Sequence, residues 1–309
     1  MSSSERSNKL KATRTLNVGK AVMLTFLTAL MMSIVAATIK YLVSSVSVEM
    51  ILLVQYLTCA ALMIPWLLRE GVKAIKTEHI GLHIARAVSG WLCLYTYFLT
   101  IKHIPLVDAV LLRNAAPLCV PIWALLWLKI IIPPVRWIPV IIGFAGIALI
   151  LQPTSDGFKL WHLLGLGSAM AMAGSIVTTR ILALTEPTSR TMFYYFFLSS
   201  FFTVPLALSK ELLIPLPALP FMIGIGLFTF FSMWCYTRAF QFASATIISP
   251  INYFDVVFTG LWGWLFWEQI PDNIALVGAV LVILGGIGSV LMGKIESSKT
   301  KESFPTRTS

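Results

Sequence analysis

Ten apolar stretches of about 20 residues follow one another along the 309-residue chain. A helix of that length spans roughly 30 Å of hydrocarbon, so each stretch is predicted to cross a membrane. Apolar residues make up 58% of the chain and charged residues only 12%, which excludes a soluble or a disordered protein. The predicted spans are 21–44, 47–68, 80–101, 106–128, 135–151, 160–184, 191–209, 218–240, 246–267 and 273–292.

Each span is apolar nearly all round, which favours helices that face the lipid bilayer on one side and other helices elsewhere. A transmembrane β-barrel would need strands that alternate in polarity, and the sequence contains none. The loops between the spans are too short for a soluble domain. The fold class predicted here is therefore an all-α integral membrane protein of ten transmembrane helices.

The net charge of +10 reports the orientation of the chain. Fifteen of its 23 Lys and Arg residues lie in the two tails and the even-numbered loops, when Arg136 at the edge of the fifth span is included, whereas the odd-numbered loops hold only Lys102, Lys159 and Lys210. The positive-inside rule then predicts both termini in the cytoplasm, with the plasma membrane of a bacterium (the inner membrane) as the expected location. Basic tails at a membrane surface meet anionic lipids, so no nucleic-acid partner is expected.

No pattern in the sequence indicates catalysis, a metal or a cofactor. The four cysteines lie inside apolar runs without a CxxC pair, and the four histidines are scattered without metal-ligand spacing. Ser/His/Asp order, paired catalytic carboxylates and an HExxH motif are all missing. A nucleotide-binding loop is missing too, so any transport must draw on a gradient or on exchange.

The chain matches itself at an offset of about 139 residues: Tyr97 falls on Tyr236, and Gly146 on Gly285. Each copy holds five spans, an odd number, so the second copy must enter the membrane in the opposite sense. Inverted repeats of this kind are built around an in-plane pseudo-twofold axis with a site near the midplane. The predicted division is a basic tail 1–19, a first repeat 20–151, a linker 152–159, a second repeat 160–292 and a tail 293–309, with both tails flexible.

Several short motifs carry a resemblance to a known family. They are the HIARAVSG opening of the third span (83–90), the IPLVDA entry of the fourth (104–109) with Pro117, the SPINY segment (249–253), the end of the ninth span (263–268) and the Gly278-to-Gly285 spacing. Over residues 20–292 the chain resembles the drug/metabolite transporter superfamily, specifically its EamA-type ten-helix members. The resemblance implies two inverted five-helix repeats that carry a small metabolite. The chain departs from the usual pattern at Lys129, where Glu is common, and at Pro139, where Gly is common.

Charged side chains inside membrane spans are costly, so they usually face a cavity or a partner. Five of them lie within two turns of a helix end, where they are predicted to anchor the helix at the interface: Lys40, Glu49, Asp108, Arg180 and Arg238. Arg86, Arg113 and Asp255 lie deeper, and we predict that they face a cavity.

The fourth and ninth spans bring polar pairs to a similar depth. The repeat offset places Arg113 and Asn114 on Asn252 and Tyr253. Prolines at 117, 121 and 250 leave carbonyls four residues earlier without their helical donors, and broken backbone beside polar side chains is typical of a transport site. The alternative is a kink that only helps the helices to pack. The predicted substrate-binding residues are Arg86, Arg113, Asn114, Asn252, Tyr253 and Asp255.

The sequence thus predicts a secondary carrier for a small polar or amphiphilic metabolite. The excess of Arg and Lys over Asp and Glu inside the spans favours an amino acid or an organic anion, held by Arg113 or Arg86. Asp255 would then pair with an arginine, or meet an ammonium or a coupling proton. One alternative is a membrane scaffold or receptor that kept the duplicated fold, with its central cavity filled by apolar side chains. A membrane-embedded enzyme acting on lipid would need a nucleophile or metal site that the sequence lacks.

Overall fold

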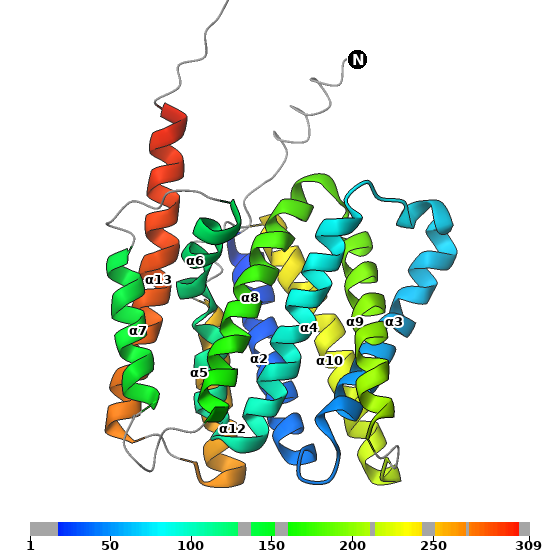
Figure 1. Cartoon of the computed structure of the whole chain (residues 1–309), viewed down its shortest axis with the longest axis horizontal. Coiled ribbons are helices and arrows are strands. Elements are labelled where there is room, and N and C mark those ends of the chain that lie inside the picture. The colour runs from blue at the N-terminus through cyan, green and yellow to red at the C-terminus, as the bar shows by residue number, and fades with distance from the viewer. Residues whose placement is uncertain are drawn as a thin grey trace, which may run out of the picture.

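The structure, a computed structural model, is a bundle of helices that stand side by side (Figure 1). It describes residues 18–128, 137–151, 160–210, 214–242, 251–269 and 272–302. The start of α2 and the end of α13 lie at the same end of the bundle. The helices of the first half are α2 (Val18–Leu42), α3 (Val48–Glu70), η1 (Val72–Ile75), α4 (Ile80–His103), α5 (Leu106–Asn114), α6 (Ala116–Leu128) and α7 (Trp137–Leu151).

The second half repeats this order. Its helices are α8 (Leu160–Thr185), α9 (Thr188–Leu208), η3 (Leu216–Ala218), α10 (Leu219–Phe242), α12 (Phe254–Trp267) and α13 (Asn273–Glu302). The two halves pack reciprocally: α4 packs on α8 as α10 packs on α2, and α3 meets its counterpart α9 as α7 meets α13. This exchange of partners confirms the prediction of an inverted duplication.

Two tryptophans show the reciprocity at atomic level. Trp123 of α6 donates its indole N–H to the carbonyl oxygen of Met170 on α8, at 2.7 Å. Trp262, 139 positions later on α12, donates its indole N–H to Oγ of Ser33 on α2, at 3.1 Å. Each half therefore uses its fourth crossing to hold the first helix of the other half.

Glycines allow α7 and α13 to approach backbone to backbone. A Cβ on Gly146 would lie 2.6 Å from the carbonyl oxygen of Gly278, and one on Gly285 would lie 2.6 Å from that of Pro139. Gly285 lies 139 positions after Gly146, and Pro139 lies 139 positions before Gly278, so the two contacts are related by the repeat. Small residues at such a crossing are the usual means of close helix packing in lipid.

Six helices in the described part of the chain are long and apolar enough to cross a membrane, and α7 and α13 contain shorter apolar segments. The predicted fourth span, 106–128, is two helices, because the chain turns at Ala115 between α5 and α6. The predicted tenth span ended at 292, whereas α13 continues to Glu302. Once a helix is nucleated, each added residue gains a hydrogen bond, so a polar extension without proline can continue it.

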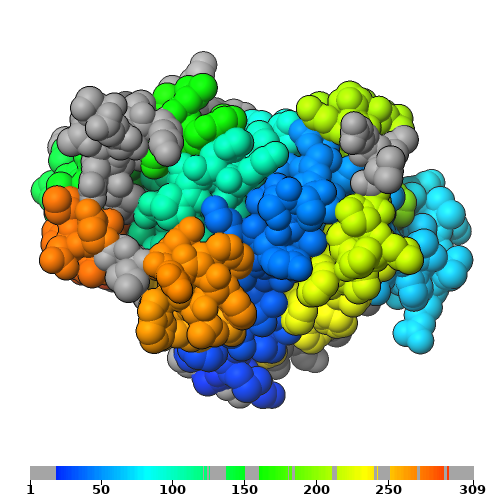
Figure 2. All heavy atoms as spheres, turned by 90° about the horizontal axis from the view of Figure 1, so that it is seen from below, coloured from blue at the N-terminus to red at the C-terminus, as the bar shows by residue number. Residues whose placement is uncertain are grey.

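Large apolar side chains cover the outside of the bundle, among them Leu68 and Phe201, which are 78% and 72% exposed. In water this surface would drive aggregation, whereas lipid tails solvate it. Figure 2 views the end opposite the termini, where the α2–α3 turn, in blue, has the start of α5 and the end of α12 on the same side of it. There the backbone N–H of Leu106 donates to Oε1 of Gln269, at 3.0 Å, and so links the halves.

Candidate functional site

The fourth and ninth crossings break at matching positions. In the first half the chain turns at Ala115, and in the second half at Tyr253, just before α12 begins at Phe254. Arg113 therefore lies in the last turn of α5, and Asp255 in the first turn of α12. A helix carries partial negative charge at its C-terminus and partial positive charge at its N-terminus, so both side chains suit the helix ends that hold them.

Arg113 and Asp255 form an ion pair between the two halves. Nη2 of Arg113 donates to Oδ2 of Asp255 at 2.7 Å, and Nδ2 of Asn114 donates to the same oxygen at 3.4 Å. The two charged residues are only 8% and 4% exposed. The guanidinium also lies over the ring of Tyr97 on α4, with Cζ 4.3 Å from the ring centre, a cation–π contact. Three of the predicted site residues thus meet at one point.

Arg86 lies elsewhere on α4, over a different tyrosine. Its Cζ is 4.2 Å from the ring centre of Tyr195 on α9, and the side chain is buried. The hydroxyl of Tyr195 shares a hydrogen bond of 3.4 Å with the hydroxyl of Tyr56 on α3. Nε and Nη1 of Arg86 have no hydrogen-bond partner within the described ranges. The structure therefore separates this arginine from the Arg113–Asp255 pair.

The remaining two predicted residues do not join the ion pair through any hydrogen bond that the described residues show. Tyr253 is buried, with its hydroxyl so close to Gly286 of α13 that a Cβ there would lie 1.6 Å from the oxygen. Asn252 is half-buried on the residues that precede α12. Pro250 and its expected free carbonyl at Thr246 lie outside the described residues.

Two of the charged residues predicted to anchor helix ends, Lys40 and Glu49, make their hydrogen bonds to groups other than the Arg113–Asp255 pair. Nζ of Lys40 donates to the carbonyl oxygens of Ile101 and Ile104, at 2.6 and 2.8 Å, and so satisfies acceptors at the C-terminal end of α4. Glu49 accepts a hydrogen bond from the hydroxyl of Tyr95, at 3.1 Å. These contacts stabilise helix ends. The side chain of Arg180 lies outside the described residues.

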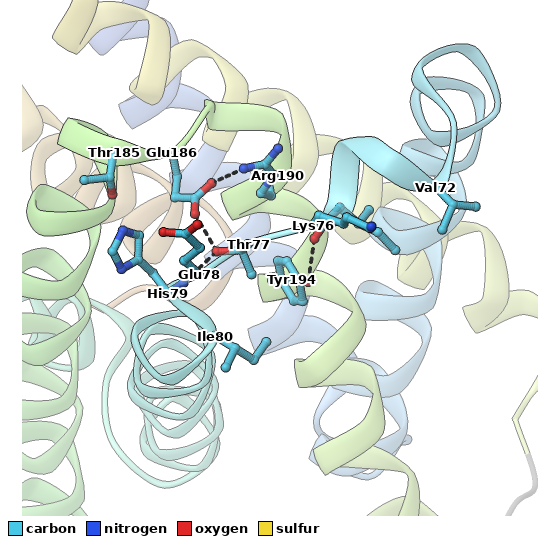
Figure 3. Close-up of a pocket in the computed structure, with 11 residues that line it drawn as sticks. Val72, Lys76, Thr77, Glu78, His79, Ile80, Thr185, Glu186, Arg190 and Tyr194 are labelled. Carbon is cyan, nitrogen blue, oxygen red and sulfur yellow. Dashed lines mark hydrogen bonds and ion pairs between the residues drawn. The ribbon is translucent and has the colours of Figure 1, made fainter.

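A polar cluster at the other end of the bundle was not predicted. Glu186, between α8 and α9, accepts from Oγ1 of Thr77 and from Nη1 of Arg190, both at 2.5 Å (Figure 3). Arg190 also donates through Nε to the carbonyl oxygen of Ala74, at 2.6 Å. We call Thr77, Glu186 and Arg190 the loop latch, because they join the α3–α4 connection of one half to the other half. The sequence signal that could have indicated this cluster is the spacing of Glu186 and Arg190, four residues apart at the start of α9.

The loop latch borders a cavity of about 800 Å³. Burial raises the pKa of Glu186, but the hydrogen bonds from Thr77 and Arg190 outweigh that effect and hold the pKa below its ordinary value. His83 stacks on Tyr194, with ring centres 4.4 Å apart, and its Nε2 lies 3.9 Å from Oε1 of Glu186. Among the described residues, no three His, Cys, Asp or Glu side chains are grouped to hold a metal ion.

A sequence model of the EamA-like transporter family matches residues 19–152 and again 159–291. The chain belongs to this family. It is therefore an integral membrane protein that transports small molecules, and not an enzyme. A crystal structure with 16% sequence identity, which covers 92% of this chain and 98% of its own, superposes with a TM-score of 0.56 and shows the same fold.

Several curated relatives are named transporters. The chain is 31% identical to the pseudopaline exporter CntI of Pseudomonas aeruginosa over 229 residues, 73% of this chain and 80% of that protein. It is 27% identical to the riboflavin transporter of Brucella anthropi over 74% of this chain and 83% of that one. It is 26% identical to the S-adenosylmethionine uptake transporter of Rickettsia felis over 78% and 82% of the two chains.

Proposed function

We propose that the protein is a secondary transporter of a small polar or amphiphilic metabolite, an amino acid or organic anion, which works by alternating access. The observation that carries this proposal is the Arg113–Asp255 ion pair. It joins the two halves at the point where the fourth crossing of each half is broken. Broken helices that bring charges to the interface of inverted repeats are the usual setting of a transport site.

The ion pair suits a mechanism in which the halves separate and close again. Burial of an ion pair costs desolvation energy that the attraction between the two charges only roughly offsets. A substrate charge that replaces one partner, or a proton that neutralises the carboxylate, can therefore shift the equilibrium between the closed and the separated halves. Protonation of Asp255 would release Arg113 and allow coupling to a proton gradient. Exchange with a second metabolite is the other source of energy that the proposal allows.

We place the protein in the inner membrane of a bacterium with both termini in the cytoplasm. The distribution of Lys and Arg supports this orientation. The start of α2 and the end of α13 lie at one end of the bundle, as this requires. The loop latch would then lie at the cytoplasmic end.

Counterflow in proteoliposomes tests the proposal. Vesicles loaded with one unlabelled compound from a panel of amino acids, organic acids, riboflavin and S-adenosylmethionine receive the labelled compound outside. We expect transient accumulation of at least one compound, and at least a tenfold loss in Arg113→Ala. Lys73→Ala, which removes an exposed cation from the α3–α4 connection, should transport normally. Equal flux in Arg113→Ala for every transported compound would contradict a role of the Arg113–Asp255 pair in transport.

Accessibility at position 252 separates a transporter from a scaffold. The four native cysteines are buried, so they should react little with thiol reagents and labelling of a single Asn252→Cys variant should report on position 252. In a transporter, membrane-impermeant reagents should reach position 252 from each side in turn. Protection from both sides, together with no counterflow, would favour a scaffold with a filled core.

A further inference from the structure

Arg86 differs from Arg113 and Arg190, which both have carboxylate partners. Arg113 is paired with Asp255, and Arg190 with Glu186. Arg86 is 7% exposed, and neither a carboxylate nor a hydrogen-bond acceptor for its Nε and Nη1 is found in the described part of the chain. A buried, unpaired cation is among the most costly groups in a membrane protein, so its presence indicates a role other than stability.

The guanidinium is nevertheless held in one place. Tyr195 supports its face, and Tyr56 fixes Tyr195 through the shared hydroxyl contact. Gly90, one turn further along α4, leaves the space that the guanidinium fills: a Cβ there would lie 2.4 Å from Nη1 and 2.6 Å from Cε2 of Tyr195. Arginine stacked on an aromatic ring keeps its in-plane N–H donors available for a planar anion.

The position of this group favours a mobile ligand. Tyr56 and Tyr195 are equivalent residues of the two repeats, 139 positions apart, so Arg86 lies beside the pseudo-twofold axis. The position equivalent to Arg86 is Ile225, which is buried and apolar. The positive charge of Arg86 is therefore not matched by a second cation at the equivalent position of the other half.

We propose that Arg86 binds the carboxylate of the transported substrate, while the Arg113–Asp255 pair holds the two halves in register. This inference rests on the proposed function and goes further, because it assigns the anion to one of the two candidate arginines. Arg113 already donates to a carboxylate of the protein itself, whereas Nε and Nη1 of Arg86 have no acceptor among the described residues. The bound carboxylate would supply the missing counter-charge and accept from Nε or Nη1.

Thermal-shift measurements on the purified full-length protein provide the first test. The probes are three acids with their neutral amides: nicotinate and nicotinamide, benzoate and benzamide, succinate and succinamide. A ligand that binds the folded state raises the apparent Tm. We expect at least one acid, and not its amide, to raise the Tm of the wild type. Arg86→Gln should abolish this difference, Arg86→Lys should keep part of it, and the charge-neutral double variant Arg113→Gln/Asp255→Asn should keep it.

The second readout needs no ligand. If Arg86 serves binding at the expense of stability, Arg86→Met should raise the apparent Tm of the ligand-free protein by about 2–4 °C, because it removes an unpaired buried charge. A structural arginine would give the opposite sign. The proposal is overturned if Arg86→Met lowers the Tm, or if acid and amide act equally on the wild type, or if only the double variant loses the acid preference.

The proposal and the transport function fail separately. Counterflow of a neutral compound without any acid preference in the thermal-shift test would support transport and contradict an anion site at Arg86. Acid-specific stabilisation that depends on Arg86, without flux of the same acid in proteoliposomes, would support an anion site at Arg86 and contradict transport.

Discussion

The hydroxyl oxygens of Tyr56 and Tyr195 lie 3.4 Å apart, and the two residues are separated by 139 positions, the offset that relates the two halves. Their rings meet edge to face, with centres 5.9 Å apart and planes at 89°. Equivalent residues of two inverted repeats can touch only near the axis that relates them. The pseudo-twofold axis therefore passes between α3 and α9, next to Arg86.

Removal of one hydroxyl should cost more than removal of both. Tyr56→Phe leaves the Tyr195 hydroxyl buried without its partner, at a cost of about 1–3 kcal/mol, and Tyr195→Phe does the same to Tyr56. The double variant leaves no unpaired donor and should be close to the wild type. Unfolding by denaturant titration of the three variants gives the coupling energy. Additive losses would show that the hydroxyls do not depend on each other.

The α7–α13 contact predicts equal damage from two distant substitutions. Gly146→Ala places a Cβ 2.6 Å from the carbonyl oxygen of Gly278, and Gly285→Ala places one 2.6 Å from Cα of Gly143. Backbone atoms cannot rotate away, so each change should separate the helices and cost about 1–3 kcal/mol. Apparent Tm values of the two variants should fall together.

Gly224→Ala is the matched control for these glycines. It also lies within a helix, α10, but a Cβ there meets no atom within 4 Å. Alanine is the better helix former by about 1 kcal/mol, so this variant should keep or gain stability. A loss equal to that of Gly146→Ala would show that the close approach of α7 and α13 is not what makes Gly146 sensitive to substitution.

The Arg113–Asp255 pair predicts a double-mutant cycle of the same form with a larger amplitude. Arg113→Gln leaves a buried carboxylate with only Asn114 as donor, and Asp255→Asn leaves a buried guanidinium. Each single change should cost about 3–5 kcal/mol, whereas the neutral pair Arg113→Gln/Asp255→Asn should cost much less. The cycle is measured by denaturant titration. Small, additive effects would mean that water already screens the pair.

The sequence predicted the architecture because the bilayer imposes it. Span length and the 139-residue repeat together predict ten helices in two inverted halves. Depth also separated Lys40, which serves a helix end, from Arg113, which serves the interface of the halves. The proline pattern predicted disturbed helices, and the chain does turn at Ala115.

Side-chain direction within the bundle was not predictable in the same way. Asn252 and Tyr253 are adjacent and polar, but Tyr253 faces α13 because Gly286 leaves room there. The placement of Arg86 depends on Tyr195, more than 100 residues away, and so on how α4 crosses α9. The loop latch was missed because its charges lie between spans, where a polar residue needs no special explanation.

The loop latch predicts a pH effect that depends on one carboxylate. The pKa of Glu186 lies below its ordinary value of 4.5, so its contribution to stability is complete above that pH and is lost as the pH falls through the folded-state pKa. Glu186→Gln keeps the size of the side chain but loses the charge-assisted bond to Arg190, which should cost about 1.5–3 kcal/mol at pH 7. Apparent Tm values from pH 7 to pH 3.5 should show the variant and the wild type converging at the acid end. The control is Glu78→Gln, a change at an exposed residue beside the same cavity, whose apparent Tm should follow that of the wild type at every pH. A difference in apparent Tm between Glu186→Gln and the wild type that stays constant with pH would contradict the role of the Glu186 carboxylate.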